Sequence, residues 1–219
     1  MKLISYYKNQ QIRTGVIESH AEGDQVVDLN DAVPSISHDL LIALNSGADV
    51  TAAAKAALAS SAPRVALASL KLAPPVPRPG KIICLGLNYY DHAKEGGRDK
   101  PEYPWFFYRG ASSLIADGEV GLRPRVSERL DYEAELAVII GKRAKHLSEA
   151  DALDCVFGYS VFNDISVRDY QKKTPQWTIG KNFDNSGPFG PVLVTADELA
   201  AGATGLRDRK STRLNSSHT

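Results

Sequence analysis

Short apolar runs separated by polar turns occupy the first part of the chain. These runs predict short strands at residues 2–7, 12–18 and 25–29. Two helices should follow, at residues 38–46, where an apolar stripe ends at Gly47, and in the alanine-rich stretch 51–62. This pattern predicts a small N-terminal domain at residues 1–73.

Prolines interrupt the pattern at residues 74–80. Four prolines within this stretch cannot continue a helix or a central strand, so we expect a linker there. Beyond it, apolar runs predict strands at residues 81–86, 136–140, 156–163 and 191–194, and Ser148 is a candidate cap for a short helix at residues 148–153. Because strands dominate and helices are short, the expected fold class is α+β and β-rich, with a second domain at residues 81–207.

The equal numbers of basic and acidic residues limit the kinds of partner that the protein is expected to bind. Lys plus Arg and Asp plus Glu number 26 each, and a zero balance argues against nucleic acid or an anionic membrane surface as the main partner. No apolar run approaches the length of a membrane span, and the start lacks the apolar stretch of a signal peptide, so we expect a cytoplasmic protein. Cys84 and Cys155 lie in apolar segments and are interpreted as buried hydrophobic residues.

The last residues differ in character from the rest of the chain. Asp208-Arg209-Lys210-Ser211-Thr212-Arg213-Leu214-Asn215-Ser216-Ser217-His218 is similar to one reading frame of a common sequencing-library adapter. A genuine polar, basic tail is the alternative that composition permits. We expect residues 208–219 to be a non-native tail and the natural sequence to stop near Leu206 or Arg207, so that the C-terminal strands of the second domain are missing.

Three acidic residues are candidate metal ligands. Glu133 and Glu135 open a predicted strand and, because side chains alternate along a strand, point to the same side. Asp164 follows the strand predicted at 156–163 and could complete a site for a hard ion such as Mg²⁺, Mn²⁺ or Ca²⁺, with a net charge of about −1 once the ion is bound. A solvated strand face and a turn aspartate are the alternatives that spacing alone leaves open.

A histidine and a lysine are candidate catalytic residues. His92 and Glu95 would be neighbours on a helical turn, and a carboxylate beside an imidazole makes a general base for water. Lys181 comes shortly after Trp177-Thr178-Ile179, interpreted as an apolar strand, and can present an ammonium to an anionic substrate or an oxyanion. Surface residues without a catalytic role are the alternative for each. Arg168 is interpreted as structural, as part of an ion pair or a loop anchor.

The order of these motifs resembles the fumarylacetoacetate hydrolase family. The resemblance runs from about residue 81 to 199 and is carried by Gly86-Leu87-Asn88-Tyr89-Tyr90-Asp91-His92, Asp131-Tyr132-Glu133-Ala134-Glu135-Leu136, Gly158-Tyr159, Asn163-Asp164-Ile165-Ser166-Val167-Arg168-Asp169, Gly180-Lys181 and Gly190-Pro191. It implies a mixed β-roll preceded by a small N-terminal domain. It also matches Glu133, Glu135 and Asp164 to metal ligands, with Mg²⁺ as the expected ion and Mn²⁺ or Ca²⁺ as alternatives.

The remaining site residues take their roles from the same resemblance. His92 matches the catalytic histidine, and Glu95 falls where some members carry its carboxylate partner. Lys181 matches a lysine that contacts substrate, and Gln171 a glutamine beside the site. Arg109 stands where many members have the lysine of a Phe-x-Lys pattern, so it is expected to bind a substrate carboxylate through its planar fork.

The resemblance implies metal-dependent hydrolysis of a carbon–carbon bond in a β-diketo or oxo acid, as in fumarylacetoacetate hydrolases or acylpyruvases. In this reaction His92, held by Glu95, deprotonates the attacking water. The first alternative is an isomerase or decarboxylase of a 2-oxo or 2-hydroxy-dienoic diacid in aromatic catabolism. The second is an inactive fragment that cannot complete its core, which the non-native tail favours, and the family's later pocket-lining Thr-Gly-Thr-Pro motif is absent. The expected partner is a small oxo acid, and the parent protein is expected to be a homodimer.

Overall fold

The structure is a computed structural model that describes residues 1–89 and 101–199. Its main sheet is built from β1 (Lys2–Lys8), β2 (Gln11–Glu18), β3 (Gln25–Asp28), β4 (Arg64–Ala66), β5 (Leu72–Ala73), β10 (Ala134–Ile140), β11 (Val156–Asn163) and β14 (Leu193–Thr195). The strands lie in the order β10-β11-β14-β1-β2-β3-β4, and β5 pairs with β1. The expected α+β, strand-dominated fold is confirmed.

Three short helices pack against the N-terminal strands: α1 (Leu29–Ala32), α2 (Leu40–Asn45) and α3 (Val50–Ala59). Each begins at an aspartate whose carboxylate accepts hydrogen bonds from the first-turn amides, and these caps are Asp28, Asp39 and Asp49. The helices bury apolar side chains, mostly alanine and leucine, in one cluster with residues of β1, β2 and β3. These buried residues have the spacing of one face of a helix, which is the pattern that predicts a helix from the sequence.

The two ends of the described chain meet in the main sheet. Strand β14 pairs with β1 through Leu3 and Leu193, and with β11 through Tyr159 and Val194. The largest buried cluster also joins residues from both sides of the stretch 74–80, which has no helix or strand. The division into domains at that stretch stays a prediction. None of the helices in the described part of the chain is long and apolar enough to cross a membrane.

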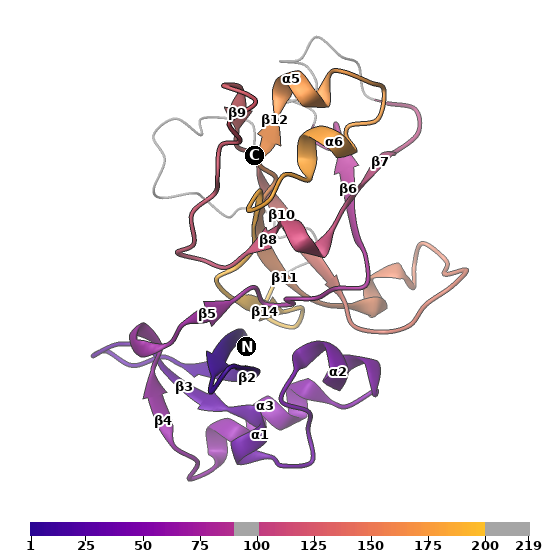
Figure 1. The fold of residues 1–219 in the computed structure, drawn as a ribbon. Coiled ribbons are helices and arrows are strands. Elements are labelled where there is room, and N and C mark those ends of the chain that lie inside the picture. The colour runs from indigo at the N-terminus through magenta and orange to yellow at the C-terminus, as the bar shows by residue number, and fades with distance from the viewer. Residues whose placement is uncertain (90–100, 200–219) are drawn as a thin grey trace.

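The described chain beyond residue 80 adds three two-stranded sheets. These pair β6 (Ile82–Gly86) with β7 (Trp105–Arg109), β8 (Leu114–Ile115) with β13 (Gly187–Pro188), and β9 (Leu130–Asp131) with β12 (Ser166–Val167). Two helical turns follow β12, α5 (Arg168–Gln171) and α6 (Thr178–Lys181), and single 3₁₀ turns lie at Leu67–Ser69, Ala111–Ser113 and Ala152–Cys155. Figure 1 shows α5, α6, β6 and β7 at the end of the molecule opposite α1, α2 and α3.

Two local predictions are wrong. The helix expected at 148–153 is a turn followed by the 3₁₀ helix Ala152–Cys155, and Ser148 caps only that turn, accepting from the Asp151 amide at 3.2 Å. Residues 177–179 do not form a strand, because Trp177 caps α6 and the next two residues lie in it. A run of three apolar residues fits a strand and a helical turn equally well. The close approach of α6 to α5 decides the outcome, since a Cβ at Gly180 would lie 2.5 Å from the Gln171 amide nitrogen.

Candidate functional site

The pairing of β10 with β11 brings three carboxylates together. Ala134 lies opposite Asn163 in the ladder, so Glu133, just before β10, faces Asp164, just after β11. The Asp164 amide donates to the Glu133 carbonyl at 2.8 Å, and the Asn163 side chain accepts from the Glu133 amide at 3.1 Å. Glu135 lies on the same side as Glu133. One oxygen from each of Glu133, Glu135 and Asp164 lies within 4.8 Å of the others, as the sequence predicts.

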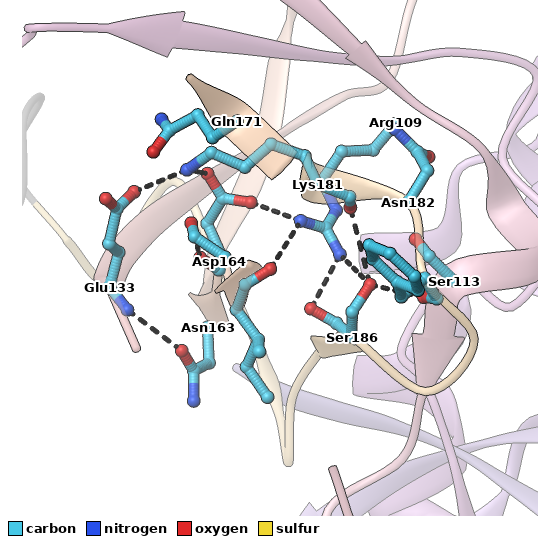
Figure 2. A network of polar contacts seen from close by, with 12 residues as sticks. Arg109, Ser113, Glu133, Asn163, Asp164, Gln171, Lys181, Asn182 and Ser186 are labelled. Atoms are coloured by element: carbon cyan, nitrogen blue, oxygen red, sulfur yellow. Dashed lines mark hydrogen bonds and ion pairs between the residues drawn. The ribbon is translucent and has the colours of Figure 1, made fainter. Parts of the chain in front are cut away.

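Lys181, the last residue of α6, lies between two of these carboxylates. Its Nζ donates to Glu133 Oε2 at 2.8 Å and to Asp164 Oδ2 at 2.5 Å, and its side chain is only 2% exposed. Figure 2 shows this ammonium between Glu133 and Asp164. The structure therefore places Lys181 within the acidic cluster that the sequence assigned to a metal.

Arg109, the last residue of β7, contacts the Asp164 carboxylate oxygen that Lys181 does not. Its Nη1 donates to Asp164 Oδ1, and its Nη2 donates to the carbonyl and the hydroxyl of Ser186 at 2.6 and 2.8 Å (Figure 2). The side chain is fully buried. Arg109 is not among the residues that line the cavity described below. This position favours a role in holding Asp164 over the expected direct contact with a substrate.

Arg168, the first residue of α5, holds Glu133 from a second direction. Its Nη1 lies 2.6 Å from Glu133 Oε1 and donates to Gln171 Oε1 at 3.0 Å, while its Nε donates to Asp131 Oδ2 at 2.9 Å. The ion pairs fit the structural role inferred from the sequence. The guanidinium also lines the cavity, which the sequence analysis missed because Asp131 and Glu133 meet Arg168 only through the pairing of β9 with β12.

The two glutamates have opposite electrostatic environments. Burial, together with the charges of Asp164 and Glu133, raises the pKa of Glu135 from 4.5 to about 8. Burial also opposes ionisation of Glu133, but the charges and hydrogen bonds of Lys181 and Arg168 hold its pKa below the ordinary value. Among the described residues, no side chain donates a hydrogen bond to the Glu135 carboxylate. Within the described residues, Glu135 therefore has no ion pair like those that Lys181 and Arg168 make with Glu133.

This donor set fits a hard divalent ion. Three carboxylate oxygens within reach of one point are ligands that Mg²⁺, Mn²⁺ and Ca²⁺ accept. The raised pKa of Glu135 shows that its negative charge is poorly compensated by the protein, and a bound cation would compensate it. The cluster is thus a candidate divalent-metal centre, and the choice among the three ions stays a prediction.

The acidic cluster opens into a cavity of about 430 Å³. Its polar lining comprises Asn88, Tyr89, Glu133, Glu135, Arg168, Gln171, Lys172 and Lys181. Gln171 thus lies beside the site, where the sequence placed it. The lining also includes the apolar side chains of Leu85, Leu87, Phe107 and Trp177, which the sequence analysis did not assign to the site. His92 and Glu95 lie outside the described residues.

Fold and site together define an α+β protein with a cavity beside three carboxylates that suit a divalent ion. Residues 81–217 match the family described as fumarylacetoacetate (FAA) hydrolase C-terminal. The chain belongs to the fumarylacetoacetate hydrolase family, as the order of its motifs implied.

Known relatives support this assignment. The chain is 36% identical over 202 residues to the mitochondrial oxaloacetate tautomerase fahd2 of Xenopus laevis, covering 91% of this chain and 63% of that protein. It is 32% identical to the solved fumarylacetoacetate hydrolase of Exiguobacterium antarcticum, with a TM-score of 0.71, covering 90% of this chain and 67% of the other. It is 28% identical to the maleylpyruvate hydrolase of Sphingobium sp. SYK-6 in complex with manganese(II) and pyruvate, with a TM-score of 0.69 and 91% and 69% covered. These relatives are thus named a tautomerase and hydrolases, and the two solved hydrolases share this chain's fold.

Proposed function

We propose that the protein is a metal-dependent enzyme that interconverts the keto and enol forms of a small 2-oxo acid. One observation carries the proposal: Glu133, Glu135 and Asp164 converge with the Lys181 ammonium, and Glu133, Glu135 and Lys181 line a cavity. We favour tautomerisation over hydrolysis because the relative that is 36% identical over 91% of the chain is named an oxaloacetate tautomerase. The chain covers 63% of that relative, so its activity is a proposal for this protein.

The residues of the cavity have distinct tasks in this reaction. A divalent ion held by the three carboxylates would supply Lewis acidity toward the oxygens of the oxo acid. Lys181 adds a buried positive charge beside the same oxygens, where charge develops as the enol loses its proton. Arg168 fixes Glu133 and donates to Gln171 Oε1. The Gln171 amide nitrogen donates to none of the residues that the structure describes, and we propose that it donates to a substrate oxygen.

The charge of the described site favours an anionic ligand. The carboxylates of Glu133, Glu135 and Asp164 equal in number the cations Lys181, Arg109 and Arg168, and the ion pairs between these groups in the described structure involve only Glu133 and Asp164. Because these charges balance, the charge of a divalent ion would be left to attract a carboxylate. The net charge of about −1 inferred from the sequence counted the three carboxylates and the ion but not these cations.

Hydrolysis of a carbon–carbon bond is the second candidate. It is favoured by the likeness to the two solved hydrolases, and it needs an activated water that tautomerisation does not. His92, with Glu95, is proposed to supply that activation. A cytoplasmic location and a homodimer stay predictions, and the Xenopus relative's name places that protein in mitochondria.

The proposal is tested by following the decay of enol absorbance of oxaloacetate with and without Mg²⁺ or Mn²⁺. Lys181→Met should reduce the metal-dependent rate about 10²–10³-fold, as loss of a single oxyanion-stabilising group does in other enzymes. Lys142→Met is the matched control, because Lys142 is exposed and does not line the cavity. Turnover that survives chelation of the metal, or equal rates in both variants, would refute the proposal.

A further inference from the structure

The apolar part of the cavity is organised around Trp177. This ring lies against the backbone of Gly86, where an added Cβ would come within 2.0 Å of its Cζ3 atom. It packs at 5.4 Å from the ring of Trp105 and at 5.9 Å, edge to face, from Phe107. Packing on several sides fixes the ring, so the wall has a defined shape.

This wall is continuous with the charged end of the cavity. Trp177 caps α6 and Lys181 ends it, so the two residues are four positions apart and lie about one helical turn, or ~6 Å, from each other. Phe107 bridges them, since its ring centroid lies 5.1 Å from Lys181 Nζ and 5.9 Å from the Trp177 ring. A ligand whose acid end meets Lys181 would therefore extend along Phe107 toward Trp177.

We propose that Trp177 and Phe107 form a subsite for an apolar or unsaturated arm on the enolisable carbon, which makes arm-bearing 2-oxo acids the preferred substrate class. The inference rests on the proposed function for its reaction, but the wall itself is independent of it. A carboxylate on that carbon, as in oxaloacetate, would lose hydration where it lies against the rings of Trp177 and Phe107. A phenyl group would instead exchange water for aromatic contacts.

The test compares two acids that share a pyruvate head and differ in the group on carbon 3: phenylpyruvate and oxaloacetate. In the wild-type protein kcat/KM for enol–keto conversion should be higher for phenylpyruvate. Trp177→Ala should lower kcat/KM for phenylpyruvate at least tenfold more than for oxaloacetate, the range expected when an apolar pocket loses its contacts. Trp177→Phe should recover most of this preference. A wild-type preference for oxaloacetate, or an equal loss for both acids, would overturn the inference.

Two further variants guard against effects on folding. Ile179→Ala alters a half-exposed residue of the same helix that does not line the cavity, so it should leave the ratio of the two kcat/KM values unchanged. Gly86→Ala keeps Trp177 but forces its ring aside, and should reduce the preference for phenylpyruvate as Trp177→Ala does. A changed ratio in Ile179→Ala, or an unchanged one in Gly86→Ala, would count against the subsite.

Measurements of binding affinity test this inference separately from the proposed function. Calorimetric titration of each acid in the presence of Mn²⁺ should show the same selective loss of phenylpyruvate affinity in Trp177→Ala. Selective loss of binding without any turnover would refute the proposed function and support the subsite. Turnover of both acids with equal weakening of both affinities would support the proposed function and refute the subsite.

Discussion

Replacing Glu135 by glutamine should stabilise the metal-free protein in alkaline solution. Burial and the neighbouring carboxylates raise the pKa of Glu135 from 4.5 to about 8 in the folded protein. Below the ordinary pKa both the folded and the unfolded chain are protonated, and the group does not affect stability. Between the two values only the unfolded chain ionises, so stability falls as the pH rises, and above about 8 the full penalty remains. Glutamine does not ionise and removes this loss.

The size of the effect follows from the displacement of the pKa. At about 1.4 kcal/mol per pKa unit, moving from 4.5 to about 8 corresponds to up to roughly 5 kcal/mol of unfolding free energy. Most of this difference in unfolding free energy between the variant and the wild type should develop as the pH rises from about 5 to about 9. Urea denaturation in the presence of a chelator, repeated across that range, measures the difference directly.

Glu133→Gln is the matched control, because it alters the same residue type in the same cavity. Lys181 and Arg168 pair with Glu133 at 2.8 and 2.6 Å and hold its pKa low, so removing its charge should destabilise the protein, by about 3–5 kcal/mol as for other buried pairs. At saturating Mn²⁺ the wild type should become more stable to unfolding than Glu135→Gln. The bound ion stabilises the folded form, and it binds best where all three carboxylates are retained. If both variants shift stability in one direction, or if the Glu135→Gln difference is independent of pH, the electrostatic account is wrong.

Three further outcomes are expected. Arg109→Met should destabilise the protein by about 3–5 kcal/mol in urea denaturation, because it leaves Asp164 with one cationic partner fewer in a buried site, and Arg109→Lys should recover only part of the loss. An equal loss in both variants would show that charge is irrelevant there. Burial opposes ionisation of Asp28, yet hydrogen bonds led by Arg13 lower its pKa below 3.8, so its contribution is present above that pH and is lost as the pH falls through the lower folded value. Asp28→Asn should therefore lower stability at neutral pH and flatten its acid dependence, and an unchanged acid profile would contradict this. His92→Gln should reduce hydrolysis of an acylpyruvate about 10²–10⁴-fold and tautomerisation far less, as paired rate measurements would show, and similar losses would assign His92 to positioning the substrate.

Much of the local structure follows from the sequence alone. Short apolar runs bounded by polar turns mark β1, β2 and β11 within a residue or two of their ends. The alternation of side chains along a strand places Glu133 and Glu135 on one side. The order of the motifs indicates the family, because those residues stand at spacings that unrelated chains do not share. These features depend on neighbouring residues, so they can be derived from a linear pattern.

The tertiary structure alone decides how the site is charged and shaped. Arg109 reaches Asp164 across 55 positions and Ser186 across 77, and β14 joins β1 from the other end of the described chain. Such contacts cannot be predicted from the periodicity of the sequence, because they depend on how separate strands pair. For the same reason the sequence placed Arg109 at the substrate and missed the wall at Trp177, whose position depends on the packing of α6 against Gly86 and Phe107. Local patterns determine which side of an element a side chain faces, whereas long-range packing determines which group it meets there.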